Sequence, residues 1–358
     1  MRGVVVHGVL GDHEPEAVSR TEGVGGAARA VATRRVGTPT AMTSYGYFLS
    51  CEQYGPHELI DQARRAEAAG FERLWISDHF HPWNDAQGQS AFVWGVIGAL
   101  SQVTTLPITT SVTAPIIRIH PAILAQATAT AAVQTNGRFI FGIGTGEALN
   151  EHVLGDHWPP VGERLEMMEE AVGIIRRMHA GGVVNHRGKH YRVEDARIYT
   201  RPDAPVPIYI SGFGAQATEL AGRIGDGYCG VAPDASLLQT FRDAGGTGPT
   251  QGGTKVAWGD DADEMIDLAH RLWPNDALPG QLAQTLPRPA DFEAAVSLVG
   301  RDQIPELFAC GSDVDRHVAQ LQKYADAGYD EVYVQQIGPD MDGFFDAYRG
   351  KVLPQLRS

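Results

Sequence analysis

Cysteine is scarce in this chain, and long apolar runs are missing altogether. The three cysteines, Cys51, Cys229 and Cys310, lie far apart and match no metal-binding or redox spacing. Such sparse use of cysteine fits a protein that stays in the reducing cytoplasm and needs no disulfides. No run of about 18 apolar residues occurs, so we expect no membrane-spanning helix.

Positive charge is also in short supply, since 29 Lys and Arg face 43 Asp and Glu and leave a net charge of -14. Nucleic acids and anionic membranes bind basic surfaces, so neither is expected as a partner. The chain also lacks a Walker loop and a complete G-x-G-x-x-G fingerprint, which argues against a nicotinamide dinucleotide. What remains is an ordinary globular composition, 43% hydrophobic and 20% charged, in 358 residues that suffice for one large α/β barrel or two smaller domains.

Strands alternate with helices from Ser44 onward. This order predicts a parallel sheet, and about eight strand–helix units predict a closed (β/α)8 barrel, the TIM barrel. The tract 273–305 interrupts the rhythm with five prolines, and we interpret it as a helical insertion near the carboxyl-end mouth of the barrel. Residues 1–41 show no strand or helix period. We interpret them as a disordered leader or as the product of a start codon assigned too far upstream, and residues 42–358 as a single domain.

Apolar periodicity sets the expected boundaries of these elements. The expected strands cover residues 45–49, 72–77, 107–113, 139–144, 206–210, 227–231, 254–258 and 331–335. The expected helices cover residues 56–70, 89–103, 121–135, 164–179, 216–224, 262–271 and 316–327. A β-hairpin is expected over residues 183–192, turning near Gly188.

Polar residues follow the second strand, in the stretch Ser77-Asp78-His79-Phe80-His81-Pro82-Trp83. A barrel enzyme presents its chemistry at the carboxyl ends of strands, and histidine can hold or release a proton near neutral pH. A single histidine at a strand end is more often structural, but the neighbouring acid and aromatic residues favour a site. The pair His79 and His81 lacks further ligands at a suitable spacing, so no metal is predicted.

Glycine-rich turns follow two other strands. Gly144-Thr145-Gly146 allows the backbone to approach a planar or phosphorylated ligand, and Gly212-Phe213-Gly214 precedes a helix whose amides could bind an anion. Each turn, taken singly, is equally compatible with an ordinary tight turn. Glu147 and Glu52 are candidate acids, because both follow strands that would converge on His79.

These motifs together resemble the luciferase-like superfamily of (β/α)8 barrels. Within it, the chain is similar to the oxidoreductases that use the deazaflavin coenzyme F420, typified by F420-dependent glucose-6-phosphate dehydrogenase. The resemblance runs from about Tyr45 to the carboxyl terminus. It rests on four stretches, residues 77–83, 110–112, 144–151 and 221–227.

The resemblance implies F420 as the cofactor and a role for individual residues. His79 would be the base that takes the hydroxyl proton as hydride leaves the substrate carbon, and Trp83 would line the substrate pocket. Glu147 would act near the pyrimidine edge of the cofactor, Glu52 would border the same pocket, and Asp78 would contact the deazaflavin. A non-proline cis peptide would join Ser111 to Val112. The remaining residues expected to bind the cofactor are Ser111, Val112, Thr145, Gly146, Asn150, Ser211, Gly212, Phe213, Gly214, Ala215, Gln216 and Ala217.

The expected substrate differs from that of the sugar-phosphate enzymes. Those relatives bind the substrate phosphate with two lysines and an arginine, and an approximate alignment places Asp234, Ala294 and Leu307 at these positions. A carboxylate and two apolar side chains cannot replace three cations. We therefore expect a dehydrogenase or ketone reductase for an uncharged alcohol, sugar or ketone, assembled as a homodimer. The alternatives are an FMN-dependent monooxygenase of the same superfamily and a non-catalytic cofactor-binding barrel.

Overall fold

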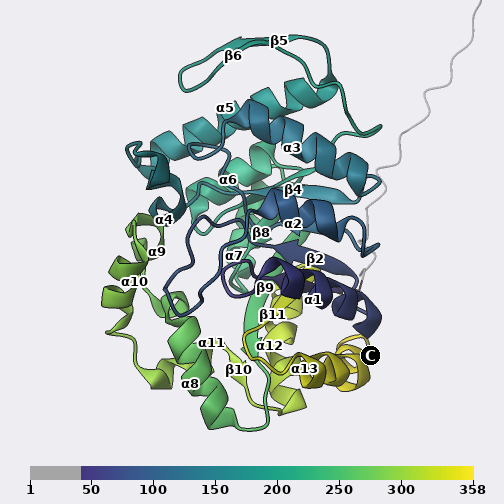
Figure 1. The fold of residues 1–358 in the computed structure, drawn as a ribbon, viewed down its shortest axis with the longest axis vertical. Coiled ribbons are helices and arrows are strands. Elements are labelled where there is room, and N and C mark those ends of the chain that lie inside the picture. The colour runs from purple at the N-terminus through teal and green to yellow at the C-terminus, as the bar shows by residue number, and fades with distance from the viewer. Residues whose placement is uncertain (1–41) are drawn as a thin grey trace, which may run out of the picture. The chain divides into compact units, whose positions relative to one another are not determined.

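Eight parallel strands close into a barrel at the centre of the protein (Figure 1). This computed structural model describes residues 42–358, so the interpretation of residues 1–41 as a leader lies outside the described residues. Strand β1 pairs with β2 on one side and β11 on the other, and the pairing of β8 with β9 closes the cylinder. The predicted (β/α)8 barrel is thus confirmed. The barrel strands are β1 (Ser44–Leu49), β2 (Arg73–Ile76), β3 (Ile108–Thr110), β4 (Phe139–Ile143), β7 (Ile208–Ser211), β8 (Gly227–Gly230), β9 (Thr250–Ala257) and β11 (Glu331–Gln336).

Helices surround the strands and cover the outside of the barrel (Figure 1). The longer ones are α1 (Pro56–Ala69), α2 (Val93–Leu100), α3 (Pro121–Gln134), α5 (Val161–Ala180), α6 (Ala215–Ile224), α7 (Ala235–Asp243), α8 (Ala262–Leu272) and α12 (Val314–Ala327). Shorter helices are α4 (Ala148–Glu151), α13 (Met341–Ala347) and α14 (Leu353–Leu356). The predicted hairpin is present as β5 (Val184–Arg187) and β6 (Arg192–Ala196), which stands beyond α5 in Figure 1. No helix of residues 42–358 is long and apolar enough to cross a membrane.

Strand β9 begins at Thr250, four residues before its predicted start at Thr254. The sequence pattern did not predict this start, because Gly252 and Gly253 are weak strand formers. Glycine is needed at position 253, since a Cβ atom there would lie 2.3 Å from the ring of Trp75. Helix α2 is shorter than predicted, and Gln89 before it instead donates its backbone N–H to the carbonyl of Glu52.

Alternate residues of each strand face either the helices or the barrel interior. The interior core stacks Trp75 on Tyr333 at 4.4 Å between ring centroids, and the indole N–H of Trp75 donates to Gln251 Oε1 at 2.8 Å. These inward positions fix the direction of the following residues, which emerge at the carboxyl-end mouth. The interior apolar side chains are Phe48, Trp75, Val112, Ile140, Tyr209, Cys229 and Tyr333.

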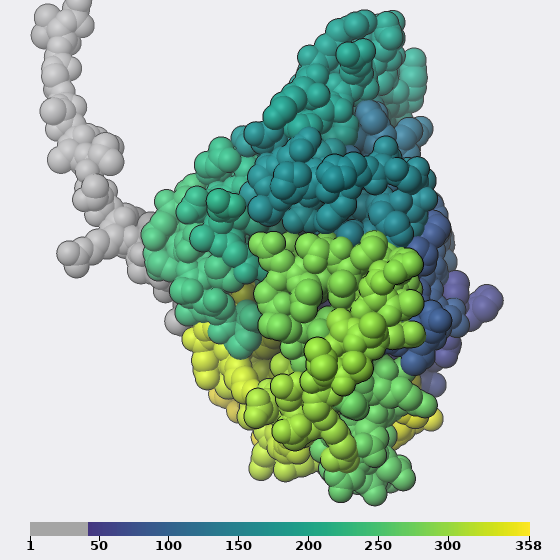
Figure 2. Space-filling model, turned by 90° about the vertical axis from the view of Figure 1, so that its left-hand side faces the viewer, coloured from purple at the N-terminus to yellow at the C-terminus, as the bar shows by residue number. Residues whose placement is uncertain are grey.

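The chain between β9 and β10 (Ala309–Cys310) forms a helical segment that we call the lid, residues 258–308. Figure 2 shows its later part in light green across the middle of one face. Besides α8, the lid contains η2 (Pro274–Ala277), α9 (Leu282–Thr285), α10 (Pro289–Val296), η3 (Arg301–Gln303) and α11 (Ile304–Leu307). The helical segment expected near the carboxyl-end face is therefore present.

Candidate functional site

An acid and a histidine come together at the barrel mouth. Along β2 and the residues after it, every second side chain points inward, namely those of Trp75, Ser77 and His79. Beyond β1, the corresponding inward side chains are those of Ser50 and Glu52. The two sets of side chains meet, because Ser50 and Ser77 both donate hydroxyl hydrogen bonds to Glu52 Oε2, at 2.8 and 2.6 Å.

The ring of His79 is held in one orientation. Its Nδ1 lies 3.1 Å from the carbonyl oxygen of His81, which can only accept, so Nδ1 carries the hydrogen. In the neutral ring Nε2 then has a free lone pair. This atom lies 3.4 Å from Glu52 Oε1, and the two side chains are only 10% and 4% exposed. A proton taken up at Nε2 would therefore lie against a buried carboxylate.

Aromatic side chains cover this pair. The ring centroid of Trp83 lies 4.9 Å from that of His79, and Trp83 meets Phe292 of α10 edge to face at 5.1 Å. The β2 loop is also tied to the lid by the side-chain amides of Asn84 and Gln87, which donate to the carbonyl of Leu272 at 3.0 and 2.8 Å. The histidine is thus enclosed between the barrel and the lid.

A cavity of about 350 Å³ lies at the carboxyl ends of β4 and β7. A side chain at Gly144 would come within 2.7 Å of Val112, and Gly146 adopts φ +70°, so both positions favour glycine. The predicted cis peptide joins Ser111 to Val112. Most of the residues predicted to bind the cofactor line this cavity, namely Val112, Thr145, Gly146, Glu147, Ser211, Gly212, Phe213, Gly214, Ala215, Gln216 and Ala217.

Three predicted cofactor residues, Ser111, Asp78 and Asn150, are not among those that line the cavity. Asn150 is buried and links two motifs, because its Oδ1 accepts from the backbone amides of Phe80 and His81 at 2.9 and 3.2 Å. Its amide group also lies 3.4 Å from Glu147 Oε2. Asn150 thereby fixes the His79 loop relative to the glycine-rich turn.

The carboxylate of Asp78 is fully buried and engaged within the protein. It accepts hydrogen bonds from Thr113 Oγ1 at 2.7 Å and from Arg118 Nη2 at 2.8 Å. Arg118 also donates its backbone N–H to Glu151 at 2.7 Å, and burial raises the pKa of the Glu151 carboxyl to about 7. No sequence motif marks Arg118, because the burial of its partners Asp78 and Glu151 is visible only in the structure.

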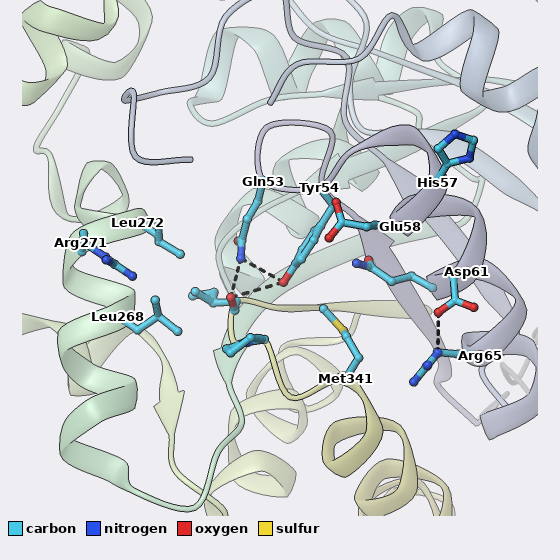
Figure 3. A pocket seen from close by; sticks show the side chains of 13 residues that line it. Gln53, Tyr54, His57, Glu58, Asp61, Arg65, Leu268, Arg271, Leu272 and Met341 are labelled. Atoms are coloured by element: carbon cyan, nitrogen blue, oxygen red, sulfur yellow. Dashed lines mark hydrogen bonds and ion pairs between the residues drawn. The ribbon is translucent and has the colours of Figure 1, made fainter. Parts of the chain in front are cut away.

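A second and larger cavity, of about 590 Å³, lies outside this mouth between α1, α8 and the turn after β11 (Figure 3). Neither His79 nor Glu147 lines it. Gln53 borders it, and the Oε1 atom of Gln53 accepts a hydrogen bond from Trp273 Nε1 of the lid at 2.8 Å. Figure 3 shows mostly long charged and apolar side chains around this space, so we place the candidate site at the histidine instead.

Residues 42–358 contain no group of three or more His, Cys, Asp or Glu side chains that could hold a metal ion. His81 is used elsewhere, because its Nδ1 lies 3.0 Å from the carbonyl oxygen of Leu149. The buried pair of His79 and Glu52 is positioned to exchange a proton at the mouth, and the glycine-lined cavity lies beside it.

A closed parallel barrel with a buried acid–histidine pair at its carboxyl-end mouth, next to a glycine-lined cavity, defines a (β/α)8 protein with an enzyme-type site. The family model described as luciferase-like monooxygenase matches residues 40–331. The chain belongs to this luciferase-like family.

Curated relatives and solved structures agree with this assignment. F420-dependent glucose-6-phosphate dehydrogenase from Microbacterium testaceum is 36% identical over 327 residues, which cover 87% of this chain and 97% of that protein. The enzyme of the same name from Nakamurella multipartita is 35% identical over 336 residues, covering 88% and 96%. A solved F420-dependent secondary alcohol dehydrogenase in complex with an F420–acetone adduct is 32% identical, with a TM-score of 0.83 over 88% of this chain and all of that one. The tetrahydromethanopterin reductase from Methanopyrus kandleri, at 22% identity and a TM-score of 0.72, shares the fold.

Proposed function

We propose that this protein is an F420-dependent oxidoreductase that moves a hydride between a CH–OH carbon of an alcohol or sugar, or the corresponding ketone, and the deazaflavin. The observation that carries this proposal is the likeness, over nearly the whole chain, to dehydrogenases named for F420. The acid–histidine pair at the mouth supports it, because oxidation of an alcohol requires a base for the hydroxyl proton.

The glycine-lined cavity fits the cofactor. Its backbone can be approached closely at Gly144 and Gly146, as a planar ring requires. The amino end of the ten-residue helix α6 also borders the cavity through Ala215, Gln216 and Ala217, and the first amides of a helix have no partner within it. These amides would hold an anionic portion of F420. When bound, F420 supplies the two-electron acceptor or donor for the substrate carbon.

His79 would handle the proton of the substrate hydroxyl. Its hydrogen-bonded Nδ1 leaves Nε2 as the basic atom, and uptake of a proton there brings the ring into an ion pair with Glu52. Ser50 and Ser77 both donate to Oε2 of Glu52 and leave Oε1 facing His79, so the pair needs little rearrangement. The lid and Trp83 would exclude water around the reacting carbon, which strengthens this charge pairing.

The other predicted residues would bind or position the cofactor. Glu147 would act at the pyrimidine edge of the ring, and Asn150 would keep Glu147 in register with the His79 loop. Asp78 would act through its ion pair with Arg118, which shapes the loop behind the ring, or through its backbone. The remaining cofactor residues that line the cavity would contact the ring, ribityl and phosphate portions, and they are Val112, Thr145, Gly146 and residues 211–217. Ser111 would act through its peptide bond to Val112.

A substrate screen that follows deazaflavin absorbance tests the proposal. Reduction of F420 by an uncharged secondary alcohol or sugar, or oxidation of reduced F420 by the matching ketone, is the expected result. The matching family model carries the description luciferase-like monooxygenase, so an FMN-dependent monooxygenase is the second candidate. Purified protein that carries FMN, consumes oxygen and leaves F420 unchanged would replace the first candidate by the second.

We further propose a cytoplasmic homodimer whose folded unit is residues 42–358. All three cysteines are free and buried, which suits a reducing compartment. Apolar side chains are exposed on the described surface, among them Phe92 and Ile123, at 62% and 57% exposure. Light scattering during gel filtration would measure the mass, and a monomer at micromolar concentration would contradict the dimer.

A further inference from the structure

The lid contributes a charged pair to the mouth of the barrel. On β9, Gln251 and Gly253 face the interior, so Lys255 is the next residue on the inward side and points toward the mouth. Its Nζ forms an ion pair with Asp276 of η2 in the lid, and it lies 4.4 Å from the ring centroid of Trp273. The side chains of Lys255 and Asp276 are 16% and 25% exposed, so solvent screens the pair only in part.

Hydrogen-bonding groups surround this ion pair. Gln335 lies beside Lys255 in the register of β11 and β9, and it is fully buried. Within the described part of the chain its Oε1 has no hydrogen-bond partner. On the lid side, Asn275 donates to Asp276 at 3.0 Å, and its own Oδ1 is also buried without a partner among the described residues. Buried amide oxygens without partners call for a donor, and the hydroxyl groups of a sugar or alcohol are such donors.

We propose that the Lys255–Asp276 ion pair makes this site selective for uncharged, hydroxyl-bearing substrates and excludes phosphorylated ones. This inference rests on the proposed function and specifies its substrate class. A free lysine at the mouth would attract a phosphate group. Here the lid carboxylate already neutralises it, so a phosphate would have to displace Asp276 and would then remain near its negative charge. An uncharged hydroxyl compound meets neither cost.

The first test measures anion binding without the cofactor. Thermal unfolding is followed during a titration with inorganic phosphate, for the wild-type chain, for Asp276→Asn and for the double variant Asp276→Asn, Lys255→Met. The wild type reports phosphate that binds elsewhere, including at α6. We expect phosphate to raise the melting temperature of Asp276→Asn by about 2–4 °C more than that of the wild type, since ligand binding stabilises the folded state. The double variant should lose this excess.

The second test measures turnover with glucose and glucose 6-phosphate as a matched pair. For each protein the ratio of kcat/KM for the phosphorylated sugar to that for the free sugar is compared. Asp276→Asn should raise this ratio on the order of tenfold or more, and Lys255→Met added to it should abolish the rise. Asp276→Glu, which keeps the charge, should leave the ratio near the wild-type value.

The outcomes separate this inference from the proposed function. If Asp276→Asn gains neither phosphate-dependent stabilisation nor a higher ratio, the role of the ion pair is wrong, whatever the enzyme oxidises. If Asp276→Asn fails to fold, Asp276→Ser takes its place in both tests with the same expected result. If the proteins transfer no hydride with any compound, the proposed function fails, and the phosphate titration still decides whether Asp276 masks Lys255.

Discussion

The two walls of the mouth are built differently. On the barrel wall, Glu52 and His79 follow short strands, are almost fully buried and are fixed by two serine hydroxyls and a backbone carbonyl. On the lid wall, Asp276 reaches Lys255 from a helical segment and remains partly exposed. This difference supports the proposal that side chains at the strand ends move the proton and that the lid selects the substrate.

The largest effect is expected at the barrel wall. His79→Ala should lower kcat by about 10²–10⁴-fold, because the proposed base for the hydroxyl proton is lost, while F420 affinity changes little. The matched control is His57→Ala, an exposed histidine that lines the outer cavity. Near-full turnover of His79→Ala on a confirmed substrate would remove the histidine from the mechanism.

Arg118 stabilises the same wall through ion pairs with Asp78 and Glu151. Arg118→Met would leave Asp78 and Glu151 buried without their cation, so we expect the free energy of unfolding to fall by about 3–5 kcal/mol. Urea unfolding measures this loss, with Arg187→Met as the exposed control. A loss below about 1 kcal/mol would show that the buried cluster does not depend on Arg118.

The buried acid Glu151 should make stability depend on pH. Its folded pKa of about 7 lies above the ordinary carboxyl value of 4.5, so the folded protein holds a proton that the unfolded chain releases. This group therefore lowers stability as pH rises from about 5 to 8. Glu151→Gln should remove that component and gain stability relative to the wild type on the order of 1–3 kcal/mol across this range. Parallel curves for the two proteins would contradict the burial of an ionisable group at this site.

A substitution in the lid wall should change the kinetic constants less than one in the barrel wall. Trp273→Phe keeps the ring over Lys255 but removes the indole donor to Gln53. We expect KM for the uncharged substrate to rise severalfold with kcat nearly unchanged, since one hydrogen bond contributes about 1 kcal/mol. A fall in kcat as large as that of His79→Ala would erase the distinction between the two walls.

The smallest effect is expected outside both walls. A chain that begins at Met42 should keep the melting temperature and activity of the full chain, because the family match begins at residue 40. A large loss of either property in a side-by-side comparison would show that the barrel needs the preceding residues.

Sequence periodicity was sufficient to predict the barrel and the strand ends that carry His79 and Glu52, because alternation along strands is local. The start of β9 was missed, since Gly252 and Gly253 have low strand propensity and are explained only by the Trp75 ring packed against them. Sequence periodicity also could not predict ion pairs between residues that are distant in the chain. Arg118 meets Asp78 forty residues away, and Lys255 meets Asp276 only because the lid folds back.

The central claim is tested most directly by an equilibrium titration of the purified protein with F420, followed by fluorescence, beside parallel titrations with NADPH and FMN. Saturable binding of F420 at micromolar or lower concentration, with no saturable binding of NADPH or FMN in the same range, is the predicted result. Tight binding of NADPH or FMN in a protein that does not bind F420 would contradict the account.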